Sequence, residues 1–356
     1  MRKLGILVLV MLLLVGCSQT SEGIEEESTG DVASMSSLDD SYYKIVNLGG
    51  SDLRERFYTD FYKTKDFETI GRDLQVLSSQ YFSTSDYYMS EGMYIGREEK
   101  KELMNWDSEY SIQPKKGTVI EGVTSPIMFS NLHEQDYYVK EGNKYILKGI
   151  SLAIVIDPKD SKNKALETPM SDATIKKYAR DCISGVYEYF QKSESMNEVK
   201  NIPILIAVYQ ATDETKSTIN GSYIYSSYCE KQVGDIKSLN YKNVIFSSDE
   251  AEKLDKVTYS EFSEIKNNLK KSAIEAAGLV GEAKYINDEI QSMIIEANLN
   301  VKTYSELQYL TSLIADNIDE KFTADFDIKV LVKSQDDLEA IILKEAGQKT
   351  KTHFLY

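Results

Sequence analysis

The sequence is poor in the residues that most often carry catalysis. It contains 2 histidines, 3 cysteines and 1 tryptophan among 356 residues. A Ser-His-Asp triad or a Cys-His pair would have to use His133 or His353. His133 lies in the polar stretch NLHEQD and His353 near the end of the sequence, so we expect both to be surface residues. The sequence also lacks HExxH, CxxC, P-loop and GxGxxG motifs. We therefore expect no enzymatic activity, no catalytic or metal-binding residues and no cofactor.

Positive charge is also in short supply. Lys and Arg number 41 against 57 Asp and Glu, which gives a net charge of −16. This balance argues against nucleic-acid binding and against electrostatic attraction to anionic lipid headgroups. With so many carboxylates a glycosidase-like pair could always be drawn, so none is singled out. The hydrophobic content of 42% is nevertheless that of a folded protein with a real core.

Long apolar runs are absent except at the start of the sequence. Leu4 to Val15 is almost wholly apolar and follows the basic residues Arg2 and Lys3. The run is too short to span a bilayer comfortably, for which about 20 residues are needed. A basic segment followed by a short apolar run is typical of a secretory signal peptide.

The end of this run predicts the type of signal peptide. Leu14-Val15-Gly16-Cys17 matches the lipobox of bacterial lipoproteins, in which the cysteine thiol receives a diacylglycerol. Lipoprotein diacylglyceryl transferase and lipoprotein signal peptidase are then the processing enzymes, and cleavage falls between Gly16 and Cys17. The predicted product, with a charge of −18, is held on the extracellular face of the plasma membrane by at least two acyl chains. An ordinary signal peptide and a simple transmembrane anchor are the alternatives.

The remaining chain is expected to divide into a tether and two domains. After the signal peptide, residues 1–16, residues 17–40 are rich in Ser, Glu, Asp and Gly, which predicts a flexible acidic tether. Residues 41–135 are predicted to form a smaller N-terminal domain. Residues 136–356 are predicted to form a larger C-terminal domain of mixed α+β structure.

Helical and strand patterns are mixed along the chain without a regular βαβ rhythm, which favours an α+β fold. Two apolar runs flanking Glu141-Gly142-Asn143 predict a hairpin, and the segment from Tyr285 to Asn298 is compatible with either a helix or a strand. The predicted helices are 66–81, 96–106, 168–192, 259–277 and 304–321. The predicted strands are 136–157, 203–210, 221–228, 244–246, 326–333 and 338–343. Asp66 is expected to cap the first of these helices, and Pro169 to lie in the first turn of the third.

Two cysteines remain after Cys17. Cys182 lies on the apolar face of a predicted helix, where a buried thiol is common, and Cys229 follows a predicted strand. A disulfide between them is possible outside the cell, and both states stay open. The tyrosine pairs, such as Tyr137-Tyr138, would either line a groove or straddle core and surface.

Three stretches resemble the CamS family of sex-pheromone precursor lipoproteins of Gram-positive bacteria. They are residues 54–95, residues 276–288 and the C-terminal run that contains VKTYSELQYLTSLIADNIDEKF and FDIKVLVKSQDDLEAIILK. The lipobox at Cys17 agrees with this resemblance. The resemblance implies a membrane-anchored surface lipoprotein with no established enzymatic activity.

The resemblance also implies that the cleaved signal peptide is trimmed to a short hydrophobic pheromone that signals to plasmid-bearing cells. The corresponding segment is Val10, Met11, Leu12, Leu13, Leu14, Val15 and Gly16, which is uncharged and apolar. Its sequence departs from the isoleucine- and alanine-rich peptides expected of the family, and a plain signal sequence is the competing interpretation. The competing function for the mature chain is a solute- or glycan-binding lipoprotein or an envelope hydrolase.

Overall fold

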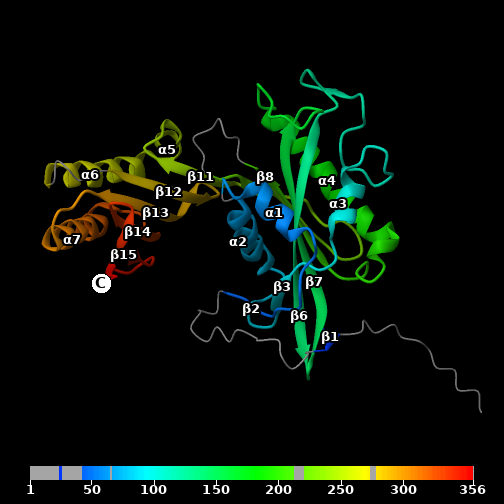
Figure 1. Ribbon diagram of the computed structural model, residues 1–356, viewed down its shortest axis with the longest axis horizontal. Coiled ribbons are helices and arrows are strands. Elements are labelled where there is room, and N and C mark those ends of the chain that lie inside the picture. Colours follow the sequence, from blue (N-terminus) through cyan, green and yellow to red (C-terminus); the bar gives the residue numbers. More distant parts are fainter. Residues whose placement is uncertain (1–23, 26–41, 65, 212–219, 273–277, 356) are drawn as a thin grey trace, which may run out of the picture.

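The computed structural model describes residues 24–25, 42–64, 66–211, 220–272 and 278–355. Two β-sheets, each with its own helices, follow one another along the chain (Figure 1). The first sheet has eight strands and the second has six. The mixture of helices and sheets confirms the predicted α+β class.

The first sheet has the strand order β10-β9-β8-β7-β6-β3-β2, with β1 paired to β7 outside this path. Its strands are β1 (Ile24–Glu25), β2 (Lys44–Ile45), β3 (Tyr88–Glu91), β6 (Ile127–Glu141), β7 (Lys144–Lys159), β8 (Ile204–Gln210), β9 (Ser222–Cys229) and β10 (Lys237–Ser238). A separate small pair consists of β4 (Val119–Ile120) and β5 (Val123–Thr124).

The long hairpin of β6 and β7 forms the centre of this sheet. The predicted turn at Glu141-Gly142-Asn143 is confirmed, with Gly142 at a positive φ of 63° that suits a residue without a Cβ. The middle of β7 is apolar on both faces because both faces are covered. Residues Ile150 and Leu152 pack on the side of α4, and Ala153 packs on the side of α2.

Helices of the first part are α1 (Arg54–Phe61), α2 (Asp66–Ser78), α3 (Arg97–Met104), α4 (Asp172–Lys192) and the 3₁₀ turn η1 (Glu194–Met196). The predicted helix from residue 168 begins only at Asp172, because the Ser171 side chain accepts a hydrogen bond from the Thr174 N–H and caps it there. Pro169 therefore precedes the helix. Asp66 is the first residue of α2, and its Oδ1 accepts hydrogen bonds from the Tyr209 hydroxyl and the Gly221 N–H, both at 2.8 Å.

The second sheet has the order β11-β12-β13-β14-β15-β16. Its strands are β11 (Tyr241–Phe246), β12 (Leu279–Ile286), β13 (Glu289–Leu299), β14 (Asp327–Ser334), β15 (Asp337–Lys344) and β16 (Lys351–Phe354). The helices α5 (Asp249–Leu254), α6 (Lys256–Ser272) and α7 (Tyr304–Lys321) pack with it around one core. The strands β13 and β14 are parallel, and α7 makes the crossover between them.

Residues 285–298, whose sequence is compatible with either a helix or a strand, form β structure. It forms the end of β12 and most of β13, with Met293, Ile295 and Ala297 buried and the residues between them more exposed. This alternation has the period of two that a half-buried strand requires.

The predicted division after residue 135 falls inside β6, so residues on both sides of it share the first sheet. The chain passes from the first sheet to the second between Ser238 and Tyr241. Residues 1–16, predicted to be the signal peptide, lie outside the described residues. Of residues 17–40, the predicted tether, only Ile24–Glu25 are described. These two residues pair with Tyr145 and Lys144 of β7.

An ion pair joins helix α2 to the second sheet. Lys284 of β12 places its Nζ 2.7 Å from Oδ1 of Asp73 on α2, and the two side chains are 16% and 1% exposed. Arg72 Nε also donates to Asp73 Oδ1, at 3.1 Å. The Lys284 ammonium lies 5.2 Å from the centroid of the Tyr241 ring. The Asp73 carboxylate therefore depends on cations from both parts of the molecule.

Candidate functional site

The site residues expected from the sequence lie outside the described residues. These are the lipidated Cys17, the cleavage position at Gly16 and Cys17, and the segment Val10 to Gly16. A concave feature is present elsewhere among the described residues. It is a cleft of about 610 Å³ lined by α1, α3 and parts of β6 and β7.

The cleft is cationic although the chain as a whole is acidic. Its lining contains five basic side chains and two carboxylates, which are Arg56, Arg97, Lys100, Lys101, Lys159, Asp60 and Asp157. Apolar side chains of Leu53, Phe61, Met104 and Ile127 complete parts of the wall. The cleft thus offers positive charge beside surfaces that can contact a carbon skeleton.

The basic side of the cleft comes from one face of α3. Arg97, Lys100 and Met104 are spaced at i, i+3 and i+7, which places them on one helix face, while Leu103 is fully buried behind it. The helix starts at Arg97 because the N–H of Gly96 donates to Glu99 Oε2 at 2.9 Å. The Arg97 N–H donates to Asp52 Oδ1 at 2.9 Å. These contacts fix the direction in which α3 presents its basic face.

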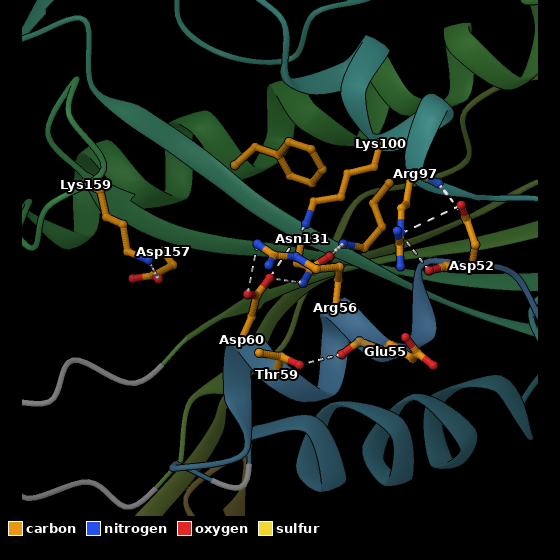
Figure 2. A network of polar contacts seen from close by, with 12 residues as sticks. Asp52, Glu55, Arg56, Thr59, Asp60, Arg97, Lys100, Asn131, Asp157 and Lys159 are labelled. Atoms are coloured by element: carbon orange, nitrogen blue, oxygen red, sulfur yellow. Dashed lines mark hydrogen bonds and ion pairs between the residues drawn. The ribbon is translucent and has the colours of Figure 1, made fainter.

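At the centre of the cleft two cations share one carboxylate (Figure 2). Lys100 Nζ lies 3.8 Å from Asp60 Oδ2, and Arg56 Nη2 lies 3.6 Å from Asp60 Oδ1. Asn131 of β6 donates from Nδ2 to Asp60 Oδ2 at 3.0 Å and so holds the carboxylate in place. One positive charge of this group is left without a matching carboxylate.

Lys100 is the recessed member of the group. Its side chain is 13% exposed, whereas that of Arg56 is 60% exposed. Burial lowers the pKa of Lys100 to about 8, Asp60 opposes this shift, and the neighbouring Arg56 and Lys159 add to it. Burial is therefore the main reason why the charged form of Lys100 is disfavoured.

The other cations of the cleft lie nearer its edges. Lys159 Nζ is 2.9 Å from Asp157 Oδ2 at the end of β7. Arg97 Nε donates to the Asp52 carbonyl at 3.0 Å, and its guanidinium is half exposed. Lys101 pairs with Glu98 on the exposed side of α3. The ion pairs of Arg97 and Lys101 are well exposed and therefore weak, so these two cations remain available to a ligand.

Two buried carboxylates hold the chain segment that leads into α3. Glu134 Oε2 accepts from the N–H groups of Tyr94 at 3.1 Å and Ile95 at 2.7 Å. Asp136 Oδ2 accepts from the Met93 N–H at 3.1 Å and from the Tyr138 hydroxyl at 3.4 Å. Both carboxylates belong to β6, so the strand fixes the position of the segment just before α3.

Burial raises the pKa of both groups. That of Glu134 rises to about 7, and that of Asp136 rises well above its usual range, with the neighbouring Glu134 as a further cause. A Cβ on Gly92 would lie 2.4 Å from Glu134 Cβ, so only glycine fits beside this carboxylate. The arrangement is one of structural hydrogen bonds to the backbone.

The expectation that His133 is a surface residue in a loop is wrong. It lies in β6, its ring stacks on Phe57 with centroids 4.7 Å apart, and its Nε2 is 3.2 Å from Gln135 Nε2. Burial lowers its pKa to about 4. The polar stretch NLHEQD forms a strand because its carboxylates find backbone partners. His353 is exposed in β16, as expected.

The two remaining cysteines are free thiols, and both are buried. Cys182 lies on the apolar face of α4 as predicted, and burial raises its pKa to about 12. The pair Tyr137-Tyr138 is fully buried, with one ring in each of the two cores of the first sheet. These tyrosines are therefore core residues and do not line a groove.

The sequence contains only a weak signal for the cleft. The stretch REEKKELM places its basic residues on one helix face, yet such runs are usually solvated. What makes this one a site is its apposition to α1 and to the end of β7, which no local pattern predicts.

Two negative results apply to the described ranges only. Nowhere between residues 42 and 355, outside the undescribed gaps, do three or more His, Cys, Asp or Glu side chains gather as they would around a metal ion. Within the same ranges, each helix is too short or too polar to cross a membrane.

The fold and the comparisons together define the class of protein. The family model described as CamS sex pheromone cAM373 precursor matches residues 50–350. The chain therefore belongs to this family of pheromone precursors. No curated protein matches it.

Two solved structures show the same fold at low identity. The crystal structure of the sex pheromone precursor from Lactobacillus salivarius subsp. salivarius UCC118 has a TM-score of 0.77 at 16% identity, covering 89% of this chain and 97% of that one. The C-terminal domain of the sex pheromone staph-cAM373 precursor from Staphylococcus aureus has a TM-score of 0.65 at 18% identity, covering 82% of this chain and 96% of that one.

Proposed function

We propose that the chain is a surface lipoprotein anchored by diacylglycerol on Cys17 at the extracellular face of the plasma membrane. The observation that carries the proposal is the lipobox Leu14-Val15-Gly16-Cys17 at the end of the apolar run. Membership of the pheromone-precursor family, matched over residues 50–350, agrees with it. Lipoprotein diacylglyceryl transferase and lipoprotein signal peptidase are the processing partners.

The second part of the proposal concerns the released signal peptide. Its last seven residues, Val10 to Gly16, are uncharged and apolar and end at the proposed cleavage position. The family description names a sex pheromone precursor. We propose that this heptapeptide is the pheromone and that it acts on plasmid-bearing cells, while the folded chain has no enzymatic role.

Lipidation is tested by labelling cells with radioactive palmitate and recovering the protein from the membrane fraction. The wild type is expected to carry label, and Cys17→Ala is expected to lose it and to accumulate as an unprocessed precursor. Cys182→Ala is the matched control, because this buried thiol should not affect labelling. Label in Cys17→Ala as strong as in the wild type would overturn the anchor.

Pheromone activity is tested with a synthetic peptide of residues 10–16 added at nanomolar concentration to plasmid-bearing cells. The expected result is induction of clumping or conjugation. A peptide of residues 4–10 from the same apolar run is the matched control and is expected to be inactive. If neither peptide induces a response, the signalling part is rejected and the lipoprotein part stands.

The competing enzyme hypothesis gains no support from the geometry of the described residues. His133, the only histidine in the first sheet, stacks on Phe57 and is bonded to Gln135. The competing binding hypothesis is favoured by one specific observation, which is the cationic cleft.

A further inference from the structure

The cationic cleft between α1 and α3 has the volume of a ligand site. About 610 Å³ lies within the range of 300–1,000 Å³ typical of small-molecule pockets. A water molecule takes about 30 Å³ in the liquid, so a bare ion with a few waters would leave most of the cleft unfilled. A ligand that uses this volume has a body in addition to its charged group.

The charge of the cleft defines the charged group. Arg56 and Lys100 share the single carboxylate of Asp60, and Lys100 is only 13% exposed. A recessed ammonium beside a guanidinium is a favourable site for an anion, because Arg can bind two oxygens at once and Lys adds a point charge. Burial is the main cause of the lowered pKa of Lys100, Asp60 opposes the shift, and the positive charges of Arg56 and Lys159 add to it.

The remaining lining defines the body of the ligand. Asn105, Ser130 and Asn163 offer amide and hydroxyl groups, and Asp157 adds a carboxylate. Such groups bind hydroxyl groups, which donate to carboxylates and exchange hydrogen bonds with amides. Phe61 and Met104 give apolar contact to a carbon skeleton. A purely apolar ligand would displace water from these charged groups and offer them no hydrogen bond in return.

We propose that this cleft binds a phosphorylated sugar or polyol, with its phosphate on Arg56 and Lys100 and its hydroxyl groups toward Asp157 and the neighbouring amides. The proposal goes beyond the lipoprotein and pheromone function and does not depend on it. The proposed event is binding alone.

The test is calorimetric titration of the chain from residue 17 onward with glucose 6-phosphate, glucose, glucuronate and inorganic phosphate. Glucose 6-phosphate is expected to bind at least tenfold more tightly than any of the other three. Equal binding of glucuronate would overturn the choice of phosphate, and equal binding of inorganic phosphate would overturn the sugar or polyol body. Absence of binding at millimolar concentration would overturn the site.

Variants separate the proposed contacts from effects on folding. Lys100→Met keeps the unbranched side-chain stem and removes the charge, so it is expected to weaken glucose 6-phosphate binding at least tenfold. The matched control is Lys192→Met, which changes an exposed lysine of α4 paired with Glu188 and is expected to bind as the wild type does.

A third variant changes the affinity in the opposite direction. Asp60→Asn removes the carboxylate that competes with the ligand for Arg56 and Lys100, so binding is expected to become several-fold tighter. A merely disruptive change would weaken binding instead. Weaker binding by Asp60→Asn, with circular dichroism and the melting temperature unchanged, would overturn the assigned position of the phosphate.

Discussion

The ion pair between Asp73 and Lys284 gives the most direct test of how the two sheets are held together. The substitution Lys284→Met keeps most of the side-chain length and removes the ammonium 2.7 Å from Asp73 Oδ1. Asp73 is 1% exposed and would keep only Arg72, an exposed side chain 3.1 Å away. Removing one partner of a buried pair costs about 3–5 kcal/mol. Because Arg72 remains, we expect the lower end, about 3 kcal/mol.

The assay is urea unfolding at neutral pH, followed by circular dichroism and compared as the free energy of unfolding. Lys242→Met is the matched control, because Lys242 lies on the neighbouring strand and pairs with Asp288 at 2.6 Å with both side chains well exposed. An exposed pair contributes about 0.2–1 kcal/mol. If both variants lose the same free energy, burial of the pair does not have the effect argued here.

A second substitution identifies the source of the loss. Asp73→Asn in the Lys284→Met background removes the carboxylate that was left with too little compensation. We expect the double variant to be more stable than Lys284→Met alone. A double variant that is less stable would show that the loss comes from side-chain packing and not from an unpaired buried charge.

Three further predictions concern the first sheet. The raised pKa of Glu134 means that the native state binds more protons than the unfolded state. The contribution of Glu134 to stability is therefore complete below about pH 4 and is lost as pH rises through about 7. Glu134→Gln should reduce the difference in unfolding free energy between acidic and alkaline solution, and an unchanged difference would refute this. Gly92→Ala should destabilise the protein by about 1–3 kcal/mol, because its Cβ would overlap Glu134 Cβ; a melting temperature equal to that of the wild type would contradict the overlap. Cys182 and Cys229 should react with a thiol reagent only after unfolding, since both are buried and have raised pKa values; rapid reaction of the native protein would exclude this.

The sequence predicts those elements whose pattern is local. The helix α4 has a continuous apolar face, and the hairpin of β6 and β7 has a glycine turn between two apolar runs. Both are found close to their predicted positions. The segment 285–298 is ambiguous in sequence because its apolar residues fit both a helical and a strand period. Only its pairing with β12 and β14 makes it a strand.

The sequence-based predictions are wrong where polar groups find their hydrogen-bond partners in distant segments of the chain. The stretch around His133 has the composition of a loop, yet Glu134 receives the N–H groups of Tyr94 and Ile95 from 40 and 39 residues away. The same reason hides the cleft, since Asp60 meets Asn131 across 71 residues. Contacts at such separations leave no periodicity in the sequence by which they could be recognised.

The pairing of Ile24–Glu25 with β7 has a consequence for the orientation of the molecule on a membrane. Seven residue steps separate Cys17 from Ile24, a reach of at most about 25 Å. A chain lipidated at Cys17 would therefore keep the hairpin end at Lys144 close to the bilayer. Asp157 lies 13 residues further along β7, about 40 Å away at the rise of a strand. The lipid attachment and the cleft would then lie at opposite ends of the hairpin.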